Sequence, residues 1–570
     1  MAAAATATRG STNRASTSSN RGGASNRGST RSKAEAGGAG GNDGKAQYNR
    51  MASLTVPDTT TMEKRGSFCD RERLLGLEKK FYTTIDKLPD KVLQRIFSYL
   101  THKEIIKNAF VCKKWRTIAY NTALWDSVSL RPDRQGLCVN NVDTLLYLIG
   151  ARFAASLRYL EMPMDVITHP VLHELAAKCP NLTNLLLDFS TAMQLHDFND
   201  MQAFPTRLRT MCICLSEVIF MEGFMRKIYN FINGLEVLHL VGTYEKADEE
   251  EEEIYEVINI HKLKSATPNL KVVNLYGINF VDDSHIEAFS SNCIQLECLA
   301  VNFCAKVNGS SLKILLSRCK KLKCLLMNQC SLQNDQVMAA DWEKSAVQEL
   351  DVTATDISTD CLVDLLTRIP SLRWLSAGQL DGFTDAVLRA WTERGNVKNL
   401  IALDLDLCDN LTEEALYKFL ARYGSNLRGL VLSGIPQCTD SLCSNVMPAL
   451  KNIRILRLGL SEALSYRLMG KIHVDGLLDN FANYAQNLER LEMSWDPESL
   501  RFSDKSQKAI DTMRVRCLRL KCLVLADGKY YEIVKANYER ADRTTVVRTA
   551  TNCCVSIVYL LSHYKDLIFN

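Results

Sequence analysis

The 570-residue sequence lacks the features that mark membrane and secreted proteins. No apolar run approaches the roughly 18 to 20 residues that a membrane-spanning helix requires. The longest, Cys553 to Leu561, is interrupted by Ser556. The start of the chain has neither the charged region nor the continuous apolar core of a secretory leader. We therefore expect a soluble protein with no membrane partner.

Motifs of catalysis, phosphate binding and metal binding are also missing. The sequence has no Gly-rich phosphate loop, no H-E-x-x-H and no G-x-S-x-G. None of its 20 cysteines forms a C-x-x-C pair, which leaves a zinc ribbon and a disulfide framework poorly supported. We expect no catalytic residue, no metal site and no cofactor, and hence a protein that is not an enzyme.

Positive charge is concentrated at the start of the chain. Residues 1–50 carry a surplus of +6, whereas the rest of the chain sums to −2. This segment has almost no large apolar side chain to offset the entropy of ordering, which predicts a disordered tail at 1–50, with a linker at 51–80. A mitochondrial transit peptide is one alternative, opposed by the Gly and Asn content. A nucleic-acid-binding tail is another, and the absence of aromatic residues before Tyr48 makes nucleic acid an unlikely partner.

A dense helical pattern occupies residues 81–132. Pro89 supplies a start signal, because proline is tolerated in the first turn of a helix. Apolar residues then recur at spacings of three and four, which places them on one helix face: Leu93, Ile96, Phe97 and Leu100. Further helical stretches follow at Ile105 to Phe110 and Trp115 to Tyr120. These patterns predict a small all-α module.

Residues 133–528 repeat one phrase, L-x-x-L-x-L with Val, Ile and Met substitutions. Ten of the thirteen spacings between its occurrences lie within the 20 to 29 residues of a leucine-rich repeat. The fourteen occurrences begin at Leu157, Leu182, Leu208, Leu235, Leu270, Leu296, Leu322, Val347, Leu372, Leu400, Leu427, Ile453, Leu488 and Leu520. Apolar-periodic helices are predicted between them, for example at Val171 to Lys178, Ser284 to Ser291, Ser311 to Arg318, Asp360 to Arg368 and Glu413 to Arg422.

One strand and one helix cannot bury their own apolar faces, so neighbouring repeats must stack. The predicted fold class is α/β, a solenoid with a curved parallel sheet inside and helices outside. Four C-x4-C pairs follow the same period, which indicates small buried thiols in a reducing compartment. An acidic insertion at 245–255 contains six consecutive acids. It is either a solubilising loop or an arm that steers basic partners.

Two parts of the chain resemble known modules. Leu88-Pro-Asp-Lys-Val-Leu-Gln-Arg-Ile-Phe-Ser-Tyr-Leu100, followed by Val111-Cys-Lys-Lys-Trp115 and Leu124-Trp125, resembles an F-box. It departs at Ile105, where Leu is common. Helix-end phrases such as Ser317-Arg-Cys-Lys-Lys-Leu322 resemble cysteine-containing leucine-rich repeats. Over residues 85 to 540 the chain is identified as a member of the F-box and leucine-rich-repeat family.

This resemblance implies a function. Members of the family dock the F-box, here 81–132, onto the Skp adaptor of an SCF ubiquitin ligase and so reach its cullin and RING subunits, while the repeats hold a protein substrate for ubiquitination. It also implies an adaptor interface, or its support, at Leu88, Pro89, Leu93, Ile96, Leu100 and Trp115. A non-degradative interaction scaffold is the alternative. The expected location is the cytoplasm, the nucleus or both.

Alternation along the repeat strands directs a second set of side chains to the concave face: Glu349, Asp351, Trp374, Asp404 and Asp406. A tryptophan among four carboxylates predicts a recognition patch for a basic or Arg-bearing substrate segment. Alternatively, the charges only keep the solenoid soluble and neighbours cover Trp374. We expect 529–570 to form a C-terminal cap or tail, by default a covering helix, or else a tail that folds back into the concave face.

Overall fold

The computed structural model describes residues 85–139, 141–216, 219–242, 255–468, 470–503, 506–539, 544–550 and 556–568. The chain divides into two units, Ala3–Pro89 and Asp90–Asn570 together with the first two residues. In the former, the described residues contain the short turn η2 (Ile85–Lys87). The predicted tail at 1–50, the linker at 51–80 and nearly all of the acidic insertion lie outside the described residues. Within the described ranges, no helix is both long and apolar enough to cross a membrane.

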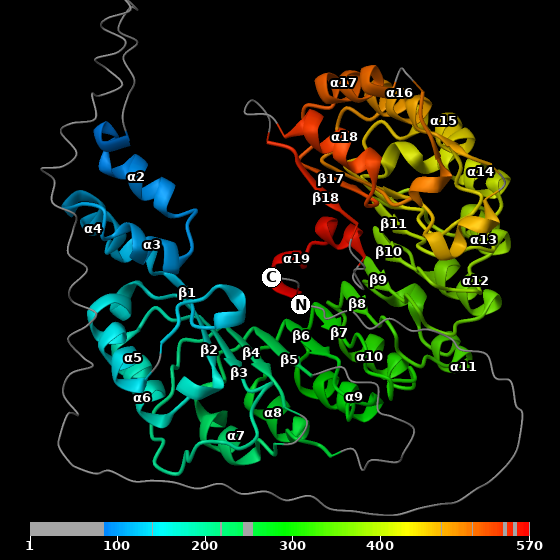
Figure 1. Cartoon of the computed structure of the whole chain (residues 1–570). Coiled ribbons are helices and arrows are strands. Elements are labelled where there is room, and N and C mark those ends of the chain that lie inside the picture. Colours follow the sequence, from blue (N-terminus) through cyan, green and yellow to red (C-terminus); the bar gives the residue numbers. More distant parts are fainter. Residues whose placement is uncertain are drawn as a thin grey trace, which may run out of the picture. The chain divides into compact units, whose positions relative to one another are not determined.

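A parallel sheet of sixteen strands runs through the described part of residues 90–570 (Figure 1). The strands are β1 (Ser127–Ser129), β2 (Tyr159–Pro163), β3 (Asn184–Asp188), β4 (Thr210–Cys214), β5 (Val237–Val241), β6 (Val272–Tyr276), β7 (Cys298–Ala300), β8 (Cys324–Leu326), β9 (Glu349–Asp351), β10 (Trp374–Ser376), β11 (Ala402–Asp404), β12 (Gly429–Val431), β13 (Ile455–Leu458), β15 (Arg490–Met493), β17 (Cys522–Leu525) and β18 (Val546–Thr549). A separate pair is formed by β14 (Ile472–His473) and β16 (Leu500–Arg501).

This sheet confirms the predicted fold class. A strand begins two residues after the start of each of the fourteen repeated phrases, and strands that are neighbours in sequence pair in register, so that Leu299, Leu325 and Leu350 lie side by side. The sheet also extends beyond the predicted array, with β1 before residue 133 and β18 after residue 528. Neither strand carries the full L-x-x-L-x-L phrase, so each was missed by a search for it.

Helices cover the outer side of the sheet (Figure 1). They are α5 (Val142–Leu148), α6 (His169–Lys178), α7 (Glu222–Ile228), α8 (Ile260–Ala266), α9 (Asp283–Asn292), α10 (Leu312–Arg318), α11 (Asn334–Met338), α12 (Thr359–Arg368), α13 (Asp385–Arg394), α14 (Glu413–Tyr423), α15 (Asp440–Val446), α16 (Val474–Tyr484), α17 (Ser506–Arg516) and α18 (Lys529–Tyr538). The five helices predicted by range correspond to α6, α9, α10, α12 and α14, with ends that differ by at most two residues.

The repeated apolar positions form the core between sheet and helices, where Leu296, Leu299 and Val301 are buried. Cysteines at helix ends join successive repeats. The Cys293 thiol donates to the Thr267 carbonyl at 3.5 Å, and the Cys319 thiol donates to the Cys293 carbonyl at 3.8 Å. Burial raises the pKa of Cys293 to about 12, so this thiol stays protonated and unreactive as a nucleophile.

In five consecutive repeats, one non-glycine residue after the strand adopts a left-handed backbone. Phe303, Gln329, Ala354, Gln379 and Leu407 all have φ between 53° and 63°, a conformation that glycine would adopt more easily. Each amide nitrogen donates to a carbonyl of the next repeat, for example Gln329 to Thr353 at 3.0 Å. This backbone ladder continues the sheet past the strands, and it offsets a strain of about 1 kcal/mol or more at each position.

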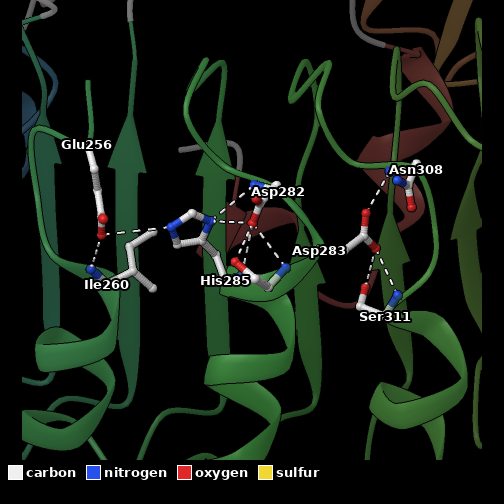
Figure 2. A network of polar contacts seen from close by, with 8 residues as sticks. Glu256, Ile260, Asp282, Asp283, His285, Asn308 and Ser311 are labelled. Carbon is white, nitrogen blue, oxygen red and sulfur yellow. Dashed lines mark hydrogen bonds and ion pairs between the residues drawn. The ribbon is translucent and has the colours of Figure 1, made fainter. Parts of the chain in front are cut away.

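Around the start of α9, a network of polar side-chain contacts connects neighbouring repeats (Figure 2). His285 lies 2.7 Å from an oxygen of Asp282 and 3.8 Å from one of Glu256. The adjacent Asp283 carboxylate accepts hydrogen bonds from the Ser311 and Asn308 backbone amides at 2.9 and 2.7 Å. The network therefore connects the residues after the acidic insertion to the following two repeats.

Candidate functional site

Three short helices form the module at the start of the second unit: α2 (Asp90–Phe97), α3 (His102–Asn108) and α4 (Lys113–Ala119). Thr101 and Glu104 form a reciprocal capping box at the start of α3, which satisfies amides that have no partner within the helix. Cys112 caps α4, accepting from the Trp115 amide at 3.4 Å. These local contacts fix the starts of α3 and α4.

The six residues predicted for the adaptor interface divide by exposure. Leu93 is fully buried, and Trp115 is half-buried with its ring edge-on to Phe97 at 5.4 Å. Leu88 and Leu100 are half-buried, whereas Pro89 and Ile96 are exposed. The prediction covered both interface residues and residues that support them, and Leu93 has the position of a supporting residue, because its side chain forms the core beneath α2. Leu93 supports the surface that Ile96 presents.

Other exposed apolar residues on this module were not singled out from the sequence. Val92 is 43% exposed and lies four residues before Ile96, so the two share a helix face that is adjacent to the buried face of Leu93. Tyr99, Phe110 and Val111 are 74%, 72% and 61% exposed. The missed signal was that α2 is apolar on two sides, of which its own module needs only one. These residues, Val92, Ile96, Tyr99, Phe110 and Val111, are called the apolar docking set below.

The predicted recognition patch lies on the concave face of the sheet as expected. In-register pairing places Trp374 between Glu349 on β9 and Ala402 on β11, with Gly429 next on β12. The surrounding concave positions are more apolar than the four carboxylates suggested: Val237, Val272, Cys298, Ala300, Cys324, Leu326, Val431 and Ile455 form one cluster with Trp374. This face therefore combines an apolar strip, formed by this cluster, with isolated acidic groups.

The expected open patch is instead covered by the C-terminal segment of the chain, Ser556–Ile568. It comprises η14 (Ile557–Leu561) and α19 (Lys565–Ile568), which Figure 1 shows on the strand side of the sheet. Trp374 is only 2% exposed, so its predicted accessibility to a substrate is wrong in this state. The physical reason is that Ile557, Val558 and Tyr564 bury their own apolar surface against the strip.

Polar groups of the patch are satisfied by this segment. The Trp374 indole donates to the Val558 carbonyl at 2.7 Å, and the Ser556 hydroxyl donates to the Asp404 carboxylate. Glu349 accepts from the Ser562 hydroxyl and, at 2.7 Å, from the His563 amide. Glu297, two repeats before Glu349, accepts from the Tyr564 hydroxyl at 3.2 Å. The segment thus meets acceptors on three separate strands or strand starts.

Burial changes the acid chemistry of this face. It raises the pKa of Asp404 to about 7, an effect strengthened by the nearby Asp406 carboxylate and opposed by the Ser556 hydroxyl. Burial likewise raises the pKa of Asp351 to about 6, against hydrogen bonds from Thr353. Asp406 itself is half-buried and accepts from the Ser433 hydroxyl. The predicted ring of four charged carboxylates is therefore partly neutralised near pH 7.

A hollow of about 830 Å³ lies near the starts of the sheet strands from β9 to β17. It is polar and basic, and among its lining residues are Arg373, Lys398, Arg428, Arg454 and Arg519. Elsewhere in the described ranges, no cluster of His, Cys, Asp and Glu suits a metal ion. The two candidate surfaces are the apolar docking set and the concave face.

Parts of the chain are similar to known F-box proteins and leucine-rich-repeat proteins. Residues 85–131 match the family model described as F-box-like. Human F-box/LRR-repeat protein 12 is 28% identical over 136 residues, 22% of this chain and 39% of that protein. A putative FBD-associated F-box protein of Arabidopsis thaliana is 30% identical over 121 residues, 20% of this chain and 30% of that protein. The chain thus spans less than two-fifths of the curated relatives it matches.

Among solved structures, a chain of the yeast Rad7 and Elc1 complex is similar with a TM-score of 0.38 and 14% identity, over 82% of this chain and 98% of that one. The leucine-rich repeat-containing protein LegL7 of Legionella pneumophila gives a TM-score of 0.31 and 16% identity, over 46% of this chain and 82% of that one. The family-model match over residues 85–131 and the similarity to the named relatives support an F-box and leucine-rich-repeat protein, and the repeat solenoid agrees with this.

Proposed function

We propose that this chain is the substrate-recognition subunit of an SCF-type E3 ubiquitin ligase. In this role the F-box docks onto a Skp-type adaptor, and through it onto cullin and RING subunits, while the solenoid binds a target protein. The chain itself makes no bond; it raises the local concentration of the target near the transfer machinery. Its free cysteines suit the reducing cytoplasm or nucleus.

The observation that carries the proposal is the apolar docking set on an F-box-like module. Five large apolar side chains, Val92, Ile96, Tyr99, Phe110 and Val111, are exposed within twenty consecutive residues. Exposed apolar groups gathered in this way are typical of protein interfaces, where a few large side chains contribute most of the binding energy. A Skp-type adaptor is the partner that an F-box implies.

The concave face supports the second half of the role. A curved sheet of sixteen strands in the described residues, about 4.8 Å apart, offers an inner surface of protein dimensions. The strip around Trp374 already holds a peptide segment, the C-terminal one, in an ordered conformation. The same face in a scaffold protein would bind without degradation, and the cellular experiment below separates the two.

The test begins with the full chain and a purified Skp-type adaptor. Ile96→Asp and Phe110→Asp place a charge in the docking set without touching the core, because both side chains are exposed. Each should weaken adaptor binding about 100-fold, by the loss of a hot-spot anchor. Tyr147→Asp is the matched control, since Tyr147 is 68% exposed on α5 outside the module. Equal binding by all three variants would refute the F-box assignment.

A cellular experiment then separates a degradation receptor from a scaffold. Affinity purification with and without proteasome inhibition compares the natural chain with the Ile96→Asp form. A receptor should recover a prey whose level rises both on inhibition and on loss of adaptor binding. Prey whose levels change in neither condition would favour the scaffold.

A further inference from the structure

The C-terminal segment Ser556–Ile568 sits on the concave face as a ligand would, and we propose that the strip beneath it is a binding site for a linear segment of a partner protein. The C-terminal segment is then the resident intramolecular ligand, and it defines what the site accepts: an apolar peptide with serine or other hydroxyl donors at its ends. The identification of that partner as a ubiquitination target rests on the proposed function.

The segment is separable from the fold that holds it. Every strand of the sixteen-stranded sheet in the described ranges finds its partners without it. The contacts of the segment are made instead to side chains, namely the indole of Trp374 and the carboxylates of Glu349 and Asp404. Removing these contacts leaves the backbone ladder of the sheet intact. An element attached in this manner opens without global unfolding.

Exposing the strip to water without any bound segment would be energetically unfavourable. Trp374, Glu349 and Asp404 are at most 7% exposed, and the polar groups of all three point to atoms of the segment. Without the segment, an apolar strip with Val272, Ala402 and other cluster members would face water beside unpaired acceptors. A replacement ligand must bring donors for the two carboxylates and an acceptor for the indole.

Small residues leave room on the strip for the C-terminal segment, and the place that it occupies there is called the seat below. Gly429 and Ala402 are adjacent in register, and they leave room for the side chains of the segment. A Cβ added at Gly429 would lie 2.6 Å from Cδ1 of Leu561 and 3.2 Å from Cγ1 of Val558. The backbone there is an ordinary strand, which does not require glycine. The absence of a side chain at residue 429 instead leaves space for the C-terminal segment. A larger side chain at residue 429 should therefore exclude the segment while preserving β12.

Occupancy of the seat then depends on the two serines. Ser556 and Ser562 donate to Asp404 and Glu349. A phosphate or a glutamate side chain at either serine would replace a donor by a negative charge beside a carboxylate, which disfavours the seated state. A partner segment and the C-terminal segment compete for one site, so a modification that releases the latter opens the site to the former.

The experiment uses the full chain and, as probe, a fluorescent synthetic peptide with the sequence of residues 556–568. In the natural chain the seat is occupied, and we expect weak peptide binding. The double variant Ser556→Glu, Ser562→Glu should bind the same peptide about tenfold or more tightly, because its own segment has been released. Adding Gly429→Val should abolish that gain, and a probe with glutamate at both serines should not bind.

Two controls make the result decisive. Lys398→Ala, at an exposed residue of the basic hollow, should leave peptide binding unchanged. Hydrogen exchange on the natural chain, which does not depend on any variant folding, should show amides of 557–568 exchanging faster than those of β11. Amides of the segment that exchange only with the core of the sheet, or a double variant that binds the probe no better, would overturn the proposal. Neither result involves the adaptor, so failure here is distinct from failure of the ligase role.

Discussion

Replacing Trp374 by phenylalanine tests how firmly the C-terminal segment is held. The change keeps an aromatic ring in the apolar strip and removes the indole donor that contacts the Val558 carbonyl at 2.7 Å. Val558 is fully buried, so water cannot replace that donor while the segment is seated. The variant therefore raises the free energy of the seated state relative to the open one.

The magnitude follows from the loss of one donor to a buried carbonyl. Such a loss costs about 1 to 3 kcal/mol, and the smaller ring also gives up packing contacts. Since about 1.4 kcal/mol corresponds to a tenfold change in an equilibrium constant, opening should become about 5 to 150 times more frequent. The sheet itself should be affected much less, because Trp374 keeps its backbone pairing with Glu349 and Ala402.

Hydrogen exchange followed by mass spectrometry measures this opening directly. Amides of 557–568 should exchange faster by the same factor of about 5 to 150, while amides of α12 change little. Trp391→Phe is the matched control: its indole nitrogen is buried and has no hydrogen-bond partner, so the same substitution there removes no hydrogen bond. Segment amides that exchange at the natural rate in Trp374→Phe, or equally fast in both variants, would refute the reasoning.

Three further predictions concern pH, the F-box core and the thiols. Burial raises the pKa of Asp404 to about 7, so between the ordinary carboxyl range and pH 7 the state with the C-terminal segment bound holds more protons than the open state. The opening of the segment should therefore increase from about pH 5.5 to about pH 7.5, as measured by hydrogen exchange corrected for the intrinsic exchange rate. Asp404→Asn should flatten that pH profile. Leu93→Ala should lower the stability of the module by about 2 to 5 kcal/mol in denaturant titration, whereas Ile96→Ala at an exposed site should change it by less than about 0.5 kcal/mol; equal losses would contradict the placement of the two residues. Native alkylation near pH 8 should label the exposed Cys112 and spare Cys293, whose pKa burial raises to about 12, and rapid labelling of Cys293 would show that the helix ends are open.

The sequence by itself determined the repeating part of this protein. Strand, turn and helix recur with one period, and each depends on residues within a single repeat, so Leu299, Leu325 and Leu350 could be aligned before the sheet was seen. The F-box helices were likewise readable from local apolar spacing and from Pro89 just before α2. Spacing could not separate Leu93 from Ile96, because both lie on apolar faces of α2 and only packing decides which face is covered.

The tertiary structure alone decided what lies on the concave face. The sequence placed Trp374 and its carboxylates there but left open whether neighbours cover Trp374, and it left two fates for the C-terminal residues. The contact that settles the matter joins Trp374 to Val558, residues 184 positions apart, and no periodicity records a pairing at that separation. Its cause is the free energy of burying an apolar strip and satisfying buried acceptors, which depends on the assembled surface and not on any local pattern.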